Sequence, residues 1–345
     1  MVRAHVAAVA FLALALAGCS GSDDTEGSPP PSDSSSPSLL PLDEPSFTGT
    51  PEGVTVTEVG DGPVGLAAVG DEAWSALPTA GEVRTGDDTR IAVGSTPLRL
   101  VATPGAVWVS VIGDGTVVRI DRRSGAVDTT AVLRPGGSEP EGLAFDGRRL
   151  WVVDQAHDRV LALDPETGRL LAEVSTGDAP RLVTAGRTGV WVSDYGAGSV
   201  TRVTPARVNG PFGGDLFRSR SRSLGARCTT PQGLAESAGV LWVACTVESR
   251  LVGVDVRTGT VVATFDDVGT ADAVVSDGDT VYVVGQAGPT VWAVDARART
   301  IGDPLVLDEL GGVTENVDAA VVGDRLVVSH PNGLRLYDVP LDLLH

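Results

Sequence analysis

The sequence contains no lysine, so all 26 of its basic residues are arginines. This excludes Schiff-base chemistry and a nucleotide-binding P-loop, both of which need a lysine. Histidine is also scarce: of four, only His157 and His330 lie inside the predicted folded region apart from the C-terminal His345. A multi-histidine metal site is therefore excluded unless carboxylates supply most of the ligands. The HExxH, GxSxG, GxGxxG and EF-hand patterns are absent too, so any active site would have to be dispersed along the chain.

Basic charge is scarce relative to acidic charge, and the net charge is −19. An acidic chain repels nucleic acid and anionic lipid, so neither is expected as a general partner. One local exception lies in residues 207–227, which carry five arginines and two phenylalanines: Arg207, Arg218, Arg220, Arg222, Arg227, Phe212 and Phe217. Two interpretations stay open for this segment, a solvated insertion loop or a docking loop for an acidic envelope protein or cell-wall polymer.

Long apolar runs are limited to the N-terminus. Arg3 precedes a short apolar stretch at residues 6–15, which is too short for a stable membrane span. The next residues, Leu-Ala-Gly-Cys at 16–19, resemble a bacterial lipobox. The resemblance implies cleavage before Cys19, acylation of its thiol and tethering outside the cytoplasmic membrane. An ordinary secretory signal with an incidental cysteine is the alternative.

Residues 19–53 follow the predicted signal peptide of residues 1–18 and are rich in Ser, Pro, Asp, Gly and Thr. Such a composition buries too little apolar surface to offset the entropy of ordering. We expect an acidic, disordered stalk with a reach on the order of 30 Å. The folded domain is then predicted to span residues 54–345.

A short apolar segment with one aromatic residue, which we call the anchor segment, recurs about every 42 residues, a period typical of a four-stranded propeller blade. Its anchor positions are Trp74, Trp108, Trp151, Trp191, Trp242, Tyr282 and, without the aromatic ring, Val327. Seven anchors predict an all-β fold, a seven-bladed β-propeller. We expect the tryptophans of the series, and also Trp292, to pack in the core between blades rather than to bind carbohydrate.

The most regular unit, residues 139–178, has four short apolar runs separated by turn residues, which predicts an antiparallel meander. One turn, Asp followed four residues later by Gly, occurs at the same place in three units: 121–125, 164–168 and 255–259. Asp can accept hydrogen bonds from turn amides, and Gly can adopt the positive φ that such a hairpin needs. Three copies of one turn support the repeat.

The two ends of the domain complement each other. Residues 54–63 match the outer strand and exit loop at residues 171–180, whereas the last unit, residues 317–338, has only three strands. We therefore expect the N-terminal strand to complete the last blade, which would remove two open sheet edges.

Residues 241–265 are similar to the YVTN-type bacterial surface propeller repeat, a group that includes YncE-like proteins. The resemblance implies a scaffold without shared catalytic residues. A membrane-anchored, monomeric binding or scaffold module that is not an enzyme is therefore the expected function.

Of the three cysteines, Cys228 and Cys245 flank a predicted hairpin made of residues 232–236 and 240–244. Since the hairpin brings its ends together in an exported protein, we predict a disulfide between them. The spacing does not match the CxxC pattern of redox enzymes.

The first residues of the seven inner strands should surround one mouth of the central channel. We call these positions the mouth ring: Val64, Leu98, Glu141, Arg181, Gln232, Asp272 and Asp318. Asp154 and Asp194 should lie on the same side. The polar members predict either a hydrated channel mouth or a ligand site, in which Glu141, Asp272 and Asp318 would converge on a divalent cation such as Ca²⁺ or Mg²⁺, or on a small cationic ligand.

Two other functions remain open. One is an enzyme resembling the streptogramin lyase and gluconolactonase propellers, which implies a metal and acidic residues on the upper face; His157 with Glu141 would be its candidate pair. The other is a sensor or accessory subunit that binds another envelope protein.

Overall fold

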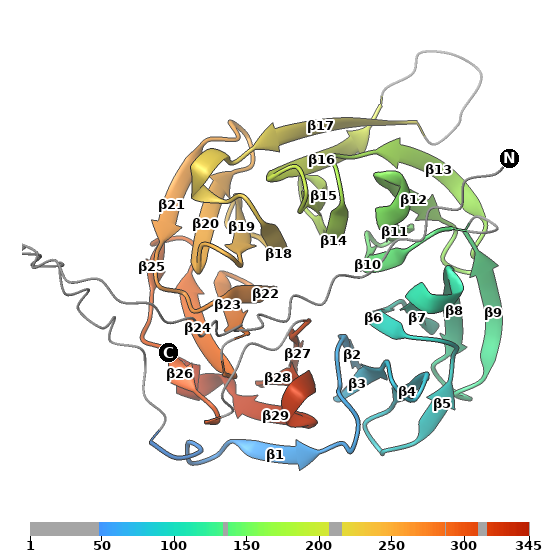
Figure 1. The fold of residues 1–345 in the computed structure, drawn as a ribbon, viewed down its shortest axis with the longest axis horizontal. Helices are drawn as coiled ribbons and strands as arrows, with labels where there is room; N and C mark the ends of the chain where they lie inside the picture. The colour runs from blue at the N-terminus through green and yellow to red at the C-terminus, as the bar shows by residue number, and fades with distance from the viewer. Residues whose placement is uncertain (1–47, 134–136, 207–215, 287, 310–315, 345) are drawn as a thin grey trace, which may run out of the picture. The chain divides into compact units, whose positions relative to one another are not determined.

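The computed structural model describes residues 48–133, 137–206, 216–286, 288–309 and 316–344. The predicted signal peptide, Cys19 and most of the predicted stalk lie outside these ranges, as do Arg207 and Phe212. Within the compact unit Pro45–His345, the described strands form seven antiparallel sheets arranged in a ring (Figure 1). This confirms the predicted seven-bladed, all-β architecture.

Blades 1 to 4 follow one another along the chain, each with its strands ordered from the centre outward. Blade 1 contains β2 (Leu66–Val69), β3 (Glu72–Leu77), β4 (Glu82–Arg84) and β5 (Arg90–Ala92), and blade 2 contains β6 (Pro97–Ala102), β7 (Ala106–Val111), β8 (Thr116–Asp121) and β9 (Val127–Val132). Blade 3 contains β10 (Pro140–Phe145), β11 (Leu150–Asp154), β12 (Arg159–Leu163) and β13 (Leu170–Ser175), and blade 4 contains β14 (Pro180–Gly186), β15 (Gly189–Asp194), β16 (Ser199–Pro205) and β17 (Phe217–Ser223).

Blades 5 to 7 complete the ring. Blade 5 contains β18 (Pro231–Ser237), β19 (Val240–Cys245), β20 (Arg250–Asp255) and β21 (Val261–Phe265). Blade 6 contains β22 (Ala271–Asp277), β23 (Thr280–Gly285), β24 (Thr290–Asp295) and two short outer pieces, β25 (Thr300–Ile301) and β26 (Leu305–Val306). Both pieces pair with β24, and Pro304, which cannot donate a ladder hydrogen bond, stands between them.

Blade 7 is closed by the N-terminal strand, as predicted. It contains β27 (Asp318–Val322), β28 (Arg325–His330) and β29 (Arg335–Pro340), and β1 (Thr55–Glu58) pairs antiparallel with β29 (Figure 1). Arg335 reinforces the pairing because its Nε lies 2.7 Å from Glu58 Oε1. The ring is thus held shut by residues almost 300 positions apart in the sequence.

In the described chain, short 3₁₀ helices occur in four connections between strands, η1 (Ile112–Asp114), η2 (Gln155–His157), η3 (Gly225–Arg227) and η4 (Pro331–Gly333), and after the last strand, η5 (Leu341–Leu344). None of the helices in the described ranges has the length and apolar character of a membrane span.

The repeated hairpin turn forms as predicted. Asp121 Oδ1 accepts hydrogen bonds from the amides of Arg123 and Ser124, and Gly125 has φ +68°. The turns at residues 164–168 and 255–259 repeat this arrangement. Blade 6 departs from it: Arg299 occupies the glycine position with φ +57°, a conformation that costs a residue with a Cβ atom about 1 kcal/mol.

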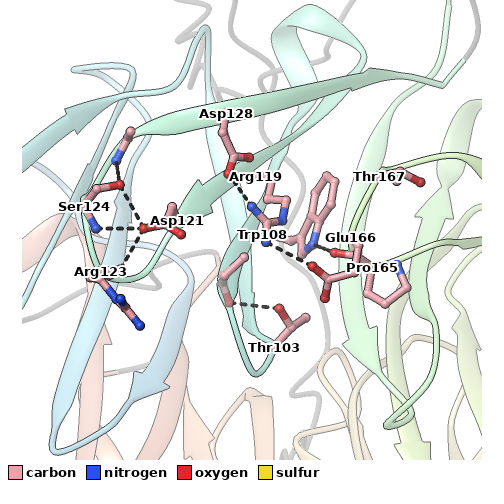
Figure 2. A network of polar contacts seen from close by, with 12 residues as sticks. Thr103, Trp108, Arg119, Asp121, Arg123, Ser124, Asp128, Pro165, Glu166 and Thr167 are labelled. Carbon is pink, nitrogen blue, oxygen red and sulfur yellow. Dashed lines mark hydrogen bonds and ion pairs between the residues drawn. The ribbon is translucent and has the colours of Figure 1, made fainter.

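The anchor tryptophans lie in the core between blades, as expected, and Trp292 is buried as well. Trp108 is fully buried, and its Nε1 donates a 3.0 Å hydrogen bond to the carbonyl of Pro165 in the turn of blade 3 (Figure 2). Beside it, Arg119 of blade 2 forms ion pairs with Asp128 of its own blade and with Glu166 of blade 3. The other anchors differ in this respect: Trp191 Nε1 also reaches the neighbouring blade, at Glu236, whereas Trp151 Nε1 binds Asp146 of its own blade.

Cys228 and Cys245 form the predicted disulfide, with a Cα–Cα distance of 5.1 Å. Cys228 follows η3 and Cys245 ends β19, directly opposite Pro231 at the start of β18. Both half-cystines are buried within one apolar cluster of blades 4 and 5. The bridge therefore ties the connection that leaves blade 4 to the core of blade 5.

Candidate functional site

The mouth ring is shaped by β-bulges in the inner strands. In β6, β10, β14 and β18 the pairing register shifts so that two residues of the inner strand stand opposite one residue of the second strand. In β6 the two are Leu98 and Arg99, opposite Ser110, whose hydroxyl accepts a hydrogen bond from the Arg99 amide. Ser193 binds the Leu182 amide in the same way. Ser110 and Ser193, which follow the anchor residues Trp108 and Trp191 by two positions, thus each stabilise the bulge of the adjacent inner strand.

Glu141 of β10 and Arg181 of β14 form an ion pair across neighbouring blades. Arg181 Nε lies 3.2 Å from both carboxylate oxygens of Glu141, whose side chain is only 2% exposed. Burial opposes the charge on Arg181, but Glu141 and the more distant Asp272 outweigh burial and raise its pKa. The Arg181 guanidinium also lies over the ring of Tyr195, 5.2 Å from its centroid. This pair is therefore fixed in place.

A second buried pair reaches across the channel. Arg99 of blade 2 extends past blade 1 to blade 7, where its Nη1 lies 3.4 Å from Asp318 Oδ2 and 3.4 Å from the carbonyl of Val317. Asp318 also accepts hydrogen bonds from the amides of Leu66 and Ala319. Burial nevertheless dominates and raises the pKa of Asp318, although Arg99 opposes the shift.

Asp272 of β22 is near enough to Arg99 and Arg181 for both positive charges to act on its carboxyl group. It is fully buried, and its Oδ2 accepts a 3.1 Å hydrogen bond from the amide of Val317. Burial raises its pKa, against the attraction of Arg99 and Arg181. The mouth therefore holds three carboxylates and two guanidinium groups, and two of the carboxylates, those of Glu141 and Asp318, are each paired with an arginine.

Several polar atoms at this mouth are buried without a hydrogen-bond partner in the described chain: Nε and Nη2 of Arg99, Oδ1 of Asp272 and Oε1 of Gln232. Buried polar groups are normally paired, because desolvation without a bond costs about 1–3 kcal/mol for each group. These four atoms comprise two donors and two acceptors. They come from blades 2, 5 and 6, so no single loop supplies them.

The channel inside the mouth is an open cavity of about 210 Å³. All seven inner strands or their flanking residues line it, mainly with apolar side chains such as Leu66, Leu100, Leu143 and Leu234, while Arg99 and Asp318 supply its charge. Both polar and apolar atoms are exposed in its wall, and such a concave surface with a few convergent polar groups suits a small molecule.

The expected convergence of Glu141, Asp272 and Asp318 on a divalent cation is not found. The described residues contain no group of three or more His, Cys, Asp and Glu side chains that could hold a metal ion. The physical reason is that Glu141 faces Arg181 and Asp318 faces Arg99. The other two predicted mouth positions, Val64 and Leu98, carry no charge, and neither is among the residues that line the cavity.

His157 and Glu141, the candidate pair of the enzyme alternative, each bind another side chain in the structure. His157 Nδ1 lies 3.0 Å from Asp154 Oδ2, while Glu141 binds Arg181. Asp154 is fully buried; burial raises its pKa, but hydrogen bonds from Arg159, His157 and the Glu139 amide outweigh this and lower it. An ionised carboxylate can only accept a hydrogen bond, so the His157 imidazole is assigned the tautomer that donates from Nδ1 to Asp154.

Asp194 and His330 are mainly structural. Asp194 is buried and accepts hydrogen bonds from the hydroxyls of Ser199 and Thr201, while burial raises its pKa. His330 caps η4, its Nδ1 accepting from the Gly333 amide, and burial lowers its pKa. Within the described residues, the hydrogen bonds of these two side chains are made to residues outside the mouth network.

Arg99 is a candidate site residue that the sequence analysis did not include. The mouth position of blade 2 was assigned to Leu98, but the bulge brings the next residue to the channel as well. A signal was present, because Arg99 is the charged residue in an otherwise apolar strand, Pro97–Ala102.

No protein-family model matches the sequence, and no curated protein is similar to it. The resemblance to YVTN-type repeats thus stays a prediction. Solved structures do match. A streptogramin B lyase superposes with a TM-score of 0.67 at 16% identity, covering 83% of this chain and 97% of the other. Virginiamycin B lyase from Staphylococcus aureus gives a TM-score of 0.69 at 13% identity, covering 83% and 98%.

BamB from Moraxella catarrhalis gives a TM-score of 0.55 at 16% identity, covering 81% of this chain and 86% of the other. The likeness is one of fold. A seven-bladed propeller carries lyases and other proteins alike, so function has to be argued from the site.

Proposed function

We propose that this protein is a lipid-anchored, extracytoplasmic propeller that binds a small polar ligand, or a polar group of an envelope partner, at the mouth of its channel without converting it. The observation that carries the proposal is a set of buried, unpartnered polar atoms at an open cavity: Arg99 lines the cavity, and Asp272 and Gln232 directly precede the lining residues Ala273 and Gly233.

The atoms define the chemistry of the ligand. Arg99 offers two N–H donors, which suit a carboxylate or another acceptor oxygen. Asp272 Oδ1 and Gln232 Oε1 offer acceptors, which suit hydroxyl or ammonium groups. The apolar wall formed by Leu66, Leu100 and Leu143 would contact the carbon skeleton. A hydroxy acid or an amino acid combines these features.

Thermal unfolding of the full chain with millimolar gluconate, glucuronate or L-glutamate tests the channel site. Binding to the folded state raises the melting temperature by mass action. We expect at least one of these probes to raise the melting temperature of the wild type. The double variant Arg99→Gln, Asp318→Asn should abolish this increase; both residues are changed so that neither charge of the ion pair is left buried alone. Arg122→Gln, outside the channel, should keep the rise. No shift with any probe in the wild type would refute the proposal.

Two features support the location. Residues 16–19 resemble a lipobox, and the Cys228–Cys245 disulfide is typical of proteins outside the reducing cytosol. Cys19→Ser should release the protein from the membrane fraction and leave its melting temperature unchanged. If the variant still sediments with membranes after a high-salt wash, the lipid anchor is wrong.

A second candidate is an enzyme of the streptogramin lyase type. His157 favours it, because Asp154 orients the imidazole while the side chain remains 27% exposed. Such a pair could act as a general base. Chromatography of virginiamycin B incubated with the wild type and with His157→Ala decides the matter: consumption by the wild type alone supports the enzyme, and an unchanged substrate excludes this reaction.

A further inference from the structure

The outer strand of blade 4, β17, has an unusual sequence in which arginine and serine alternate from Arg218 to Ser223. It lies at the rim of the ring (Figure 1). Within the described sheet it pairs only with β16, so its other edge presents unpaired N–H and C=O groups. Such an edge is a template for strand addition.

The register places three arginines on one face of the strand. Arg218, Arg220 and Arg222 stand opposite Thr204, Arg202 and Val200 of β16. Alternate residues on a strand are about 6.6–6.8 Å apart, so the charges form a regular row. Arg220 opposite Arg202 is also a like-charged cross-strand pair, which is unfavourable on its own.

The inner member of that pair is fixed by the fold. Arg202 lies over the ring of Trp191 at 5.1 Å, and it donates hydrogen bonds to the carbonyls of Thr188 and Val256. Arg222 packs near the turn at Gly259, where an added Cβ atom would lie 2.3 Å from its Nε. Arg218 and Arg220 are exposed. Phe217 is not free to dock, because it packs edge-on against Trp151 of blade 3.

The row is not neutralised within the described residues. None of Arg218, Arg220 and Arg222 forms an ion pair there, whereas Arg159 and Arg335, which lie beside outer strands of other blades, pair with Glu173 and Glu58. Edge protection by charge accounts for single charged residues on other outer strands, such as Arg90 of β5, Asp128 of β9 and Glu173 of β13, but β17 carries three arginines on one face. In a chain of net charge −19, this row is a local basic surface built for an anion.

We propose that β17 binds an extended acidic segment of a partner protein, which adds to blade 4 as a fifth strand and places Asp or Glu at alternate positions opposite the arginine row. The free edge favours a peptide over an anionic polymer, since main-chain hydrogen bonds need a matching strand. The fold already uses the same pairing mode when β1 adds to β29. The proposal is independent of the channel site.

The test is fluorescence anisotropy of the full chain with a labelled nine-residue peptide that alternates Glu and Thr, at low salt. We expect Arg218→Glu with Arg220→Glu to weaken binding by about tenfold or more, because a cationic patch becomes anionic. Arg123→Glu with Arg148→Glu is the matched control: both arginines are exposed on other blades, and the change in net charge is the same. This control should bind within about twofold of the wild type.

Two further probes separate the sources of affinity. N-methylation of the peptide at alternate residues removes main-chain donors and should weaken binding about as much as the charge reversal. Linear polyphosphate should compete poorly. The proposal is overturned if the peptide does not bind, if the control variant loses affinity equally, or if N-methylation has no effect and polyphosphate displaces the peptide. An unchanged melting temperature shows that both variants are folded.

Discussion

Removing the disulfide should destabilise the domain by restoring freedom to its unfolded chain. Cys228 and Cys245 are both buried, so the bond itself is shielded in the folded protein. In the unfolded state the bond closes a loop whose ends are 17 residues apart. The entropy of closing such a loop corresponds to about 3 kcal/mol at 25 °C. For a domain of this size, that free energy lowers the melting temperature by about 5 °C.

Urea unfolding of three samples separates loop entropy from packing. The oxidised wild type is compared with the wild type reduced in dithiothreitol and with Cys228→Ala plus Cys245→Ala. Reduction keeps the sulfur atoms and should lower the free energy of unfolding by about 3 kcal/mol. The double variant should fall further, because alanine leaves a small cavity in the cluster of blades 4 and 5. Equal stability of the oxidised and reduced wild type would refute the reasoning.

Three other predictions follow from single features. Deleting residues 54–59 removes β1 and should lower the melting temperature sharply, since β29 becomes an open edge; an unchanged value in calorimetry would contradict strand closure. Arg299→Gly should raise the free energy of unfolding by about 1 kcal/mol, whereas Gly125→Ala should lower it by about as much, both measured in urea. Burial raises the pKa of Asp272, so the folded state holds its proton more tightly than the unfolded state. As pH rises from about 4, the wild type should therefore lose stability relative to Asp272→Asn, and a difference that is constant with pH would contradict this.

Much of the fold could be predicted because its signals are local. Each anchor tryptophan sits in a short apolar strand, and each Asp-to-Gly turn closes on itself through hydrogen bonds within five residues. The repeat of these local features along the chain predicts the number of blades. Closure of the ring by the N-terminal strand could also be predicted from a local sequence match, because residues 54–63 resemble an outer strand found elsewhere in the chain.

The candidate site was only partly predictable. The mouth ring follows from the start of each inner strand, so Glu141, Arg181, Gln232, Asp272 and Asp318 could be named in advance. Their partners could not. Arg99 and Asp318 are more than 200 residues apart, and their contact depends on a bulge in β6 and on the width of the channel.

The sequence alone determined the strands, the turns, the number of blades and the disulfide, because strand propensity, turn chemistry and short-range closure act over a few residues. Only the tertiary structure decided that Glu141 and Asp318 pair with arginines instead of gathering around a cation, and that His157 faces Asp154. These contacts lie between residues brought together by the curvature of the ring and by β-bulges. Both depend on how the blades pack, which no local pattern of residues records.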